Sequence, residues 1–144
     1  MVDIMMISSD FVQDLRISRL CKDILASNER IFFVSSLNKN GRAVESKFRN
    51  DRIITKMSKP EIEMFYMQRA LQTSLCKEFD DLIGPLNFIT IHRETVLELI
   101  FPYSKGLMLA VCDLDVIPYY LAKKILFILH DFDWTLKNTH MYNA

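Results

Sequence analysis

The segment MSKPEIEMFYMQRALQ, residues 57–72, is too apolar for a helix with a single buried face. Its start carries helix signals, because Ser58 can cap the first amides, Pro60 suits the first turn, and Glu61 follows Ser58 in capping-box spacing. A helix with one buried face needs only three or four apolar residues in two turns. The apolar residues here exceed that number: Ile62, Met64, Phe65, Tyr66, Met67, Ala70 and Leu71. The segment therefore predicts a helix with two apolar faces.

This central helix, expected over about residues 59–83, divides its apolar residues into two arcs at 100° per residue. The long arc is expected to cover a sheet and contains Met64, Phe65, Leu71, Leu75, Cys76, Phe79, Leu82 and Ile83. The short arc contains Ile62, Tyr66, Met67 and Ala70. An apolar patch exposed on a monomer usually marks an interface, so we expect the short arc to pack against a second subunit. The alternative is that the N-terminal arm or the 49–58 loop covers it within one chain.

Helices and strands alternate along the rest of the chain. Helical periodicity over residues 10–28 is followed by strands at 31–37 and 42–48, and Asn40-Gly41 between them is a strong hairpin signal. Residues 49–58 predict a loop. Gly84-Pro85 ends the central helix, and three strands at 86–94, 96–103 and 106–113 predict an antiparallel meander.

A last helix is expected to begin at an Asp115 cap, with Pro118 in its first turn. Residues 1–133 are expected to form a single domain, and residues 134–144 a loosely ordered C-terminal tail. The element order is α-β-β-α-β-β-β-α. The meander strands are apolar on both faces in places, as at Leu99-Ile100. The fold class predicted is therefore a three-layer α/β/α arrangement with a five-stranded antiparallel sheet.

Charge and composition restrict the class of protein. Lys plus Arg equals Asp plus Glu, 18 each, which argues against a nucleic-acid-binding protein, although a local basic patch remains possible. The sequence has neither a signal-peptide pattern nor an apolar run long enough for a membrane span. Cys21, Cys76 and Cys112 form no CxxC pair and predict buried free thiols in a reducing cytosol. A cytoplasmic location is expected.

No pattern of catalytic or ligand-binding residues stands out. The histidines, His92, His130 and His140, lack metal-ligand spacing, and no glycine loop suits a nucleotide. Asp113 and Asp115 are best explained as turn and cap residues, and the basic residues of the 47–56 segment as a solvated loop: Lys47, Arg49, Arg52 and Lys56. We expect no catalytic, cofactor or metal site, and no enzyme activity.

The hairpin IFFVSSLNKNGRAVESKF and the strand GLMLAVCD before the final helix give the sequence a family resemblance. Over about residues 10–133 it resembles the roadblock family, named for a dynein light chain, within the wider profilin-like class of folds. The nearest relatives are expected among divergent archaeal proteins of this type.

The resemblance implies a homodimer in which the central helix packs beside its twin and the third strands pair edge to edge. An unpaired strand edge invites such pairing. The expected interface residues are Ile62, Tyr66, Met67, Ala70, Phe88, Thr90 and His92. Replacing Tyr66 and Met67 by charged residues is expected to give a monomer.

The resemblance further implies a non-enzymatic scaffold or regulator, in a family whose members often act beside small Ras-like GTPases. The alternative from the residues is a small-molecule sensor domain. Its ligand would occupy an apolar pocket between sheet and helix, lined by the Met- and Phe-rich core.

Overall fold

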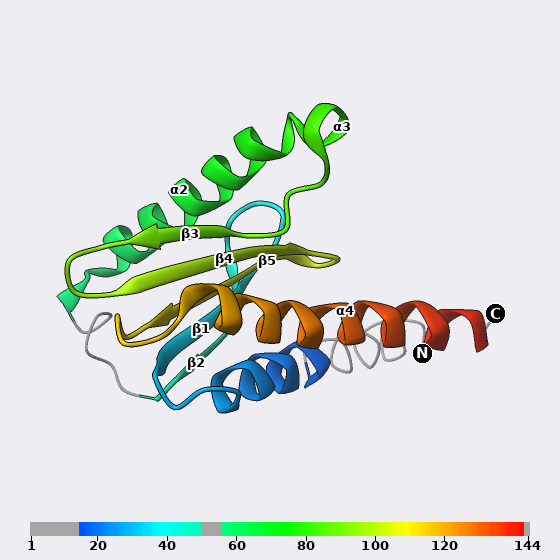
Figure 1. Ribbon diagram of the computed structural model, residues 1–144, viewed down its shortest axis with the longest axis horizontal. Coiled ribbons are helices and arrows are strands. Elements are labelled where there is room, and N and C mark those ends of the chain that lie inside the picture. Colours follow the sequence, from blue (N-terminus) through cyan, green and yellow to red (C-terminus); the bar gives the residue numbers. More distant parts are fainter. Residues whose placement is uncertain (1–14, 50–55, 143–144) are drawn as a thin grey trace, which may run out of the picture.

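The computed structural model describes residues 15–49 and 56–142, with side chains described as far as residue 138. A five-stranded antiparallel sheet lies between two helical layers (Figure 1). Its strands are β1 (Ile31–Leu37), β2 (Ala43–Phe48), β3 (Ile89–His92), β4 (Leu97–Tyr103) and β5 (Gly106–Cys112). The order across the sheet is β2-β1-β5-β4-β3. The predicted fold class and the antiparallel meander are confirmed.

Each face of the sheet has its own apolar core. On one face, a helix at residues 15–26 and α4 (Pro118–Tyr142) pack over residues such as Val34, Phe101 and Ala110. On the other face, α2 (Lys59–Lys77) packs over Ile100 and Leu109. A short helix, α3 (Asp80–Ile83), follows α2. The expected continuous helix over 59–83 is therefore interrupted after Lys77.

The hairpin turn between β1 and β2 is built around Asn38 and Gly41. The Asn38 side-chain oxygen accepts hydrogen bonds from the amides of Asn40 and Arg42, at 2.9 and 3.1 Å. Gly41 has a φ of 77°, which only glycine adopts readily. The Asn-Gly signal in the sequence predicted this hairpin correctly.

The predicted capping box begins α2. The Ser58 hydroxyl accepts from the Glu61 amide at 3.3 Å, and the Glu61 carboxylate accepts from the Ser58 amide at 2.9 Å. Hydrogen bonds from Ser58 lower the pKa of the Glu61 carboxyl group; the bond from the Ser58 backbone has the larger effect and the bond from its side chain the smaller one. The start of α2 is thus determined by residues three apart in the sequence.

The largest differences from the expected boundaries are at the start of β3 and at the two ends of α4. β3 covers only Ile89–His92, so Phe88 precedes the strand. α4 begins at Pro118, and Asp115 accepts a hydrogen bond from Arg30 at 3.2 Å. α4 also continues to Tyr142 where a loose tail was expected from residue 134, because Phe132 and Leu136 prolong its half-buried side.

Candidate interaction surfaces

α2 faces the sheet with the arc that the sequence had assigned to an interface. Tyr66 is only 6% exposed, and Ile62 and Ala70 pack against the same core. Of the long arc expected to cover the sheet, Phe65 alone joins this core. The expected orientation of α2 was therefore wrong.

A buried ion pair explains this orientation. Arg69 on α2 donates from Nε and Nη2 to the two carboxylate oxygens of Glu98 on β4, at 2.6 and 3.1 Å. The side chains of Arg69 and Glu98 are 8% and 2% exposed, and Arg93 adds a second contact to Glu98 at 2.7 Å. Because a buried carboxylate needs a cation, Arg69 must point inward, and Tyr66 and Thr73 turn inward with it. Counting apolar residues alone missed this pair, although Glu98 in the apolar strand LELIFPY was a visible signal.

The opposite side of α2 carries an exposed apolar stripe. We call it the α2 outer row: Met64, Met67, Leu71 and Leu75, each between 53% and 61% exposed. Phe79, Leu82 and Ile83 continue the exposed apolar surface beyond the end of α2. The spacing of three and four residues places the row on one face of the helix.

The β3 edge is the second candidate surface. β3 is the last strand of the sheet and pairs only with β4 among the described strands, for example Thr90 with Leu99. Thr90 is half-buried and His92 is exposed, whereas Phe88 packs on Phe101 with ring centroids 5.9 Å apart. Figure 1 shows α2 and β3 on the same side of the molecule. Of the seven interface residues expected from the sequence, Ile62, Tyr66 and Ala70 pack into the core of one chain. The interface role of the other four stays a prediction: Met67, Phe88, Thr90 and His92.

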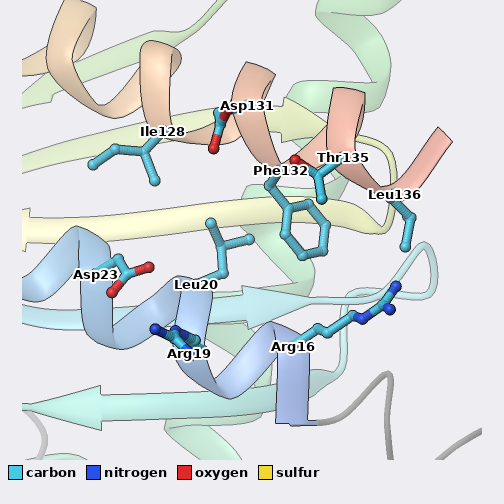
Figure 2. A pocket seen from close by; sticks show the side chains of 9 residues that line it. All are labelled: Arg16, Arg19, Leu20, Asp23, Ile128, Asp131, Phe132, Thr135 and Leu136. Carbon is cyan, nitrogen blue, oxygen red and sulfur yellow. The ribbon is translucent and has the colours of Figure 1, made fainter. Parts of the chain in front are cut away.

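A pocket lies between the helix at residues 15–26 and α4, with a volume of about 310 Å³. Figure 2 shows Leu20 and Phe132 pointing into the space between the helices, with Arg16 and Arg19 on the side of the first helix. Within the described chain, neither arginine forms an ion pair. This pocket lies between two helices. A pocket of about 390 Å³ between α2 and the β4–β5 strands, lined by Ala70, Thr73 and Leu107 among others, has the position between sheet and helix that the sensor alternative expected.

Several of the acidic and basic groups singled out in the sequence have structural partners. Arg30 lies 3.9 Å from Asp113 and 3.2 Å from Asp115. Arg49 donates to the backbone carbonyls of Leu25, Asn28 and Ile31. Lys47 pairs with Glu45 at 3.3 Å. Arg52 and the His140 side chain lie outside the described parts. Within the described chain, no group of three His, Cys, Asp or Glu side chains could coordinate a metal ion.

Two of the three cysteines are buried, as expected, and one is not. Burial raises the pKa of Cys21 and of Cys112 to about 12, so both thiols stay protonated at neutral pH. Cys76, on α2, is exposed, which corrects the expectation for that residue. Protonated, buried thiols are poor nucleophiles.

Solved structures share this architecture. The Roadblock/LC7 domain from Streptomyces avermitilis is 8% identical, covers 86% of this chain and 97% of its own, and has a TM-score of 0.61. This chain has the roadblock fold. MglB from Myxococcus xanthus is 12% identical, with 85% of this chain and 91% of that chain covered and a TM-score of 0.64. MglC from the same organism is 11% identical, with 83% of this chain and 98% of that chain covered and a TM-score of 0.55.

At these identities the likeness to roadblock domains concerns the fold alone. No protein-family model matches the sequence, and a search of curated proteins finds no match. The expected archaeal-type branch stays a prediction. None of the described helices has the length and apolar character required to cross a bilayer.

Proposed function

We propose that the protein is a non-enzymatic homodimeric platform in the cytoplasm that binds a protein partner, a small Ras-like GTPase, on the surfaces outside its dimer interface. The observation that supports the dimer is the α2 outer row. Met64, Leu71 and Leu75 point away from the sheet on one helix face, and Met67 lies at the edge of this row beside the β1–β2 turn. Such an exposed stripe is typical of a protein interface.

The β3 edge supports the same dimer. A two-fold axis would bring the α2 outer row of one subunit against that of the other, because the same surface is used twice in such an interface. The outer edge of β3, unpaired among the described strands, lies on the same side of the molecule (Figure 1) and can pair with its copy. The resemblance to the roadblock family implies this arrangement of helix and strand, and the GTPase partner is proposed from that resemblance.

The proposed interface differs from the expected one in its α2 residues, and it leaves out Phe88, which packs on Phe101. It contains the α2 outer row, together with Thr90 and His92 on β3. Ile62, Tyr66 and Ala70 instead stabilise the core of one subunit. A charged residue at position 66 would unfold the chain, so the Tyr66 and Met67 double replacement does not test the dimer.

Light scattering over a range of concentrations tests the dimer. The wild-type protein is expected to have the mass of two chains, and the Leu71→Glu/Leu75→Glu variant the mass of one. Both leucines are exposed in the single chain, so the variant should remain folded. A matched control is Leu114→Glu/Ile117→Glu, which charges two exposed apolar residues before α4 and should stay dimeric. A monomeric wild type, or a dimeric Leu71→Glu/Leu75→Glu variant, would contradict the proposal.

The pocket between the two helices supports a second candidate, a small-molecule sensor. Leu20 and Phe132 provide an apolar wall, and Arg16 and Arg19 can attract a carboxylate. Asp23 and Asp131 also line the pocket and offset part of that positive charge. Octanoate is a suitable probe. If the protein is such a sensor, octanoate should raise the Tm of the wild type but not that of the Arg16→Gln/Arg19→Gln variant. Equal Tm values with and without octanoate would remove the support for this ligand class.

A further inference from the structure

α4 exposes a row of aromatic side chains on the side that faces away from the sheet. Tyr120, Phe127 and Trp134 are separated by seven residues each and are 67–76% exposed. Leu121 and Ile125, on the inner side of the same helix, are buried. At 1.5 Å per residue the three rings extend over about 21 Å along the helix. They can therefore all contact one flat surface at the same time.

A row of basic side chains runs beside the aromatic row. Lys123, His130 and Lys137 repeat at the same seven-residue spacing, and all three are exposed. On the other flank of the aromatic row, Lys124 donates to the Ser27 carbonyl at 2.7 Å, and Asp131 is exposed. The outer face of α4 thus combines aromatic rings with long cationic side chains, and we call it the α4 face.

The helical layer that contains α4 has an excess of positive charge, although the whole chain is balanced. The exposed charged residues of α4 and the helix at 15–26 are Arg16, Arg19, Lys22, Lys123, Lys124 and Lys137 against Asp23 and Asp131. Across the sheet, segment 59–83 exposes Lys59 and Lys77 against Glu61, Glu63, Glu78 and Asp81. The aromatic row therefore lies on the positively charged layer of the molecule.

A second copy of the chain fits the α4 face poorly. Packing two aromatic rows together would also bring both basic rows into the interface, and like charges in close contact repel. The α2 outer row differs in this respect, because its Met and Leu side chains have no basic row of this kind beside them.

An anionic bilayer surface fits both rows. Trp and Tyr rings have an apolar body and a polar atom, and Lys has an apolar stem with a charged end, so all three suit the boundary between lipid and water. A helix with aromatic residues on one face and Lys beside them can lie in the plane of that boundary. A flat lipid surface contacts a straight row without needing a matching groove.

We propose that the α4 face binds the surface of an anionic lipid bilayer, with the axis of α4 parallel to the membrane. The rings of Tyr120, Phe127 and Trp134 enter the headgroup region, and Lys123 and Lys137 lie near the lipid phosphates. This binding is peripheral and needs no membrane-spanning helix. It is independent of the proposed dimer, because α2 packs on the other face of the sheet.

Trp134 is the only tryptophan in the chain and lies within the proposed contact, so its fluorescence reports binding directly. The probes are vesicles of phosphatidylcholine mixed with phosphatidylglycerol, and vesicles of phosphatidylcholine alone. With the mixed vesicles, the Trp134 emission should shift to shorter wavelength and the protein should float with the lipid. Both responses should weaken as salt is added, because salt screens the lysines from the anionic lipid.

Two charge variants distinguish binding through the α4 face from a general effect of the protein's net charge. Lys123→Gln/Lys137→Gln should lower the partition coefficient about 30-fold, given the effect expected of each lysine near an anionic surface. Lys59→Gln/Lys77→Gln removes the same charge from α2 and should change the coefficient less than about threefold. Phe127→Ser should reduce the Trp134 shift without changing the circular dichroism spectrum, since Phe127 is exposed.

Three results would overturn the proposal. The first is no emission shift and no flotation with the mixed vesicles. The second is an equal loss of binding in both lysine variants. The third is an emission shift that depends on protein concentration in the absence of lipid, which would show that a second copy covers the row.

Discussion

Glu98 is the residue on which the position of α2 depends. Its carboxylate is buried on β4 and accepts from Arg69 and Arg93. Glu98→Gln keeps the shape but removes the negative charge, which leaves the Arg69 guanidinium buried without an anion. We expect this variant to lose about 3–5 kcal/mol of unfolding free energy, measured by urea denaturation.

Two further variants identify the origin of that loss. Glu94→Gln, at an exposed position, should change the unfolding free energy by less than about 0.5 kcal/mol. Arg69→Met/Glu98→Leu should recover most of the stability, because apolar residues can replace a buried ion pair. A double variant as unstable as Glu98→Gln would show that the loss does not come from an unpaired charge.

Two buried side chains, Cys21 and Cys112, and the partly buried Tyr103 make the unfolding free energy depend on pH in the alkaline range. Burial raises the pKa of Cys21 and Cys112 from 9.0, and that of Tyr103 from 10.0, to about 12 in each case. Above pH 9 the unfolded chain therefore releases protons that the folded chain retains, so higher pH favours unfolding. The unfolding free energy should fall between about pH 9 and pH 12. Cys21→Ala should make that decline shallower, and an unchanged slope would contradict the assignment.

At the scale of single elements, local signals predicted structure well. The Asn38–Gly41 turn and the Ser58–Glu61 capping box depend on residues within a few positions of each other, so the sequence shows them directly. The face that α2 presents to the sheet depends instead on a contact between residues 69 and 98. Helical periodicity found two apolar arcs on α2 but could not show which one covers the sheet.

The contact between the β1–β2 turn and α2 can be tested at this scale. A Cβ atom on Gly41 would lie 3.0 Å from the Ala70 Cβ and 3.2 Å from the Met67 sulfur, in addition to the strain of a φ of +77°. Gly41→Ala should therefore cost about 1–3 kcal/mol of unfolding free energy. In an Ala70→Gly background the same change should cost at least about 0.5 kcal/mol less. An identical cost in both backgrounds would mean that the turn does not contact α2.

At the scale of the whole molecule, the sequence predicted the sheet and its two helical layers but not the division of surfaces between them. An apolar row lies on the α2 side of the sheet, and an aromatic and basic face lies on the α4 side. The net charge of the chain conceals this division. The layer with α4 has an excess of exposed positive charge and the layer with α2 an excess of exposed negative charge, so the two cancel in the total. Neither surface could be assigned before the orientation of each helix was known.

The position of these two surfaces on opposite faces of the sheet predicts that they act independently. The Leu71→Glu/Leu75→Glu variant should be monomeric and should still give the full Trp134 emission shift at saturating mixed vesicles. Light scattering and fluorescence on the same samples provide the measurement. A monomer that gives no shift at any lipid concentration would show that lipid binding requires the dimer.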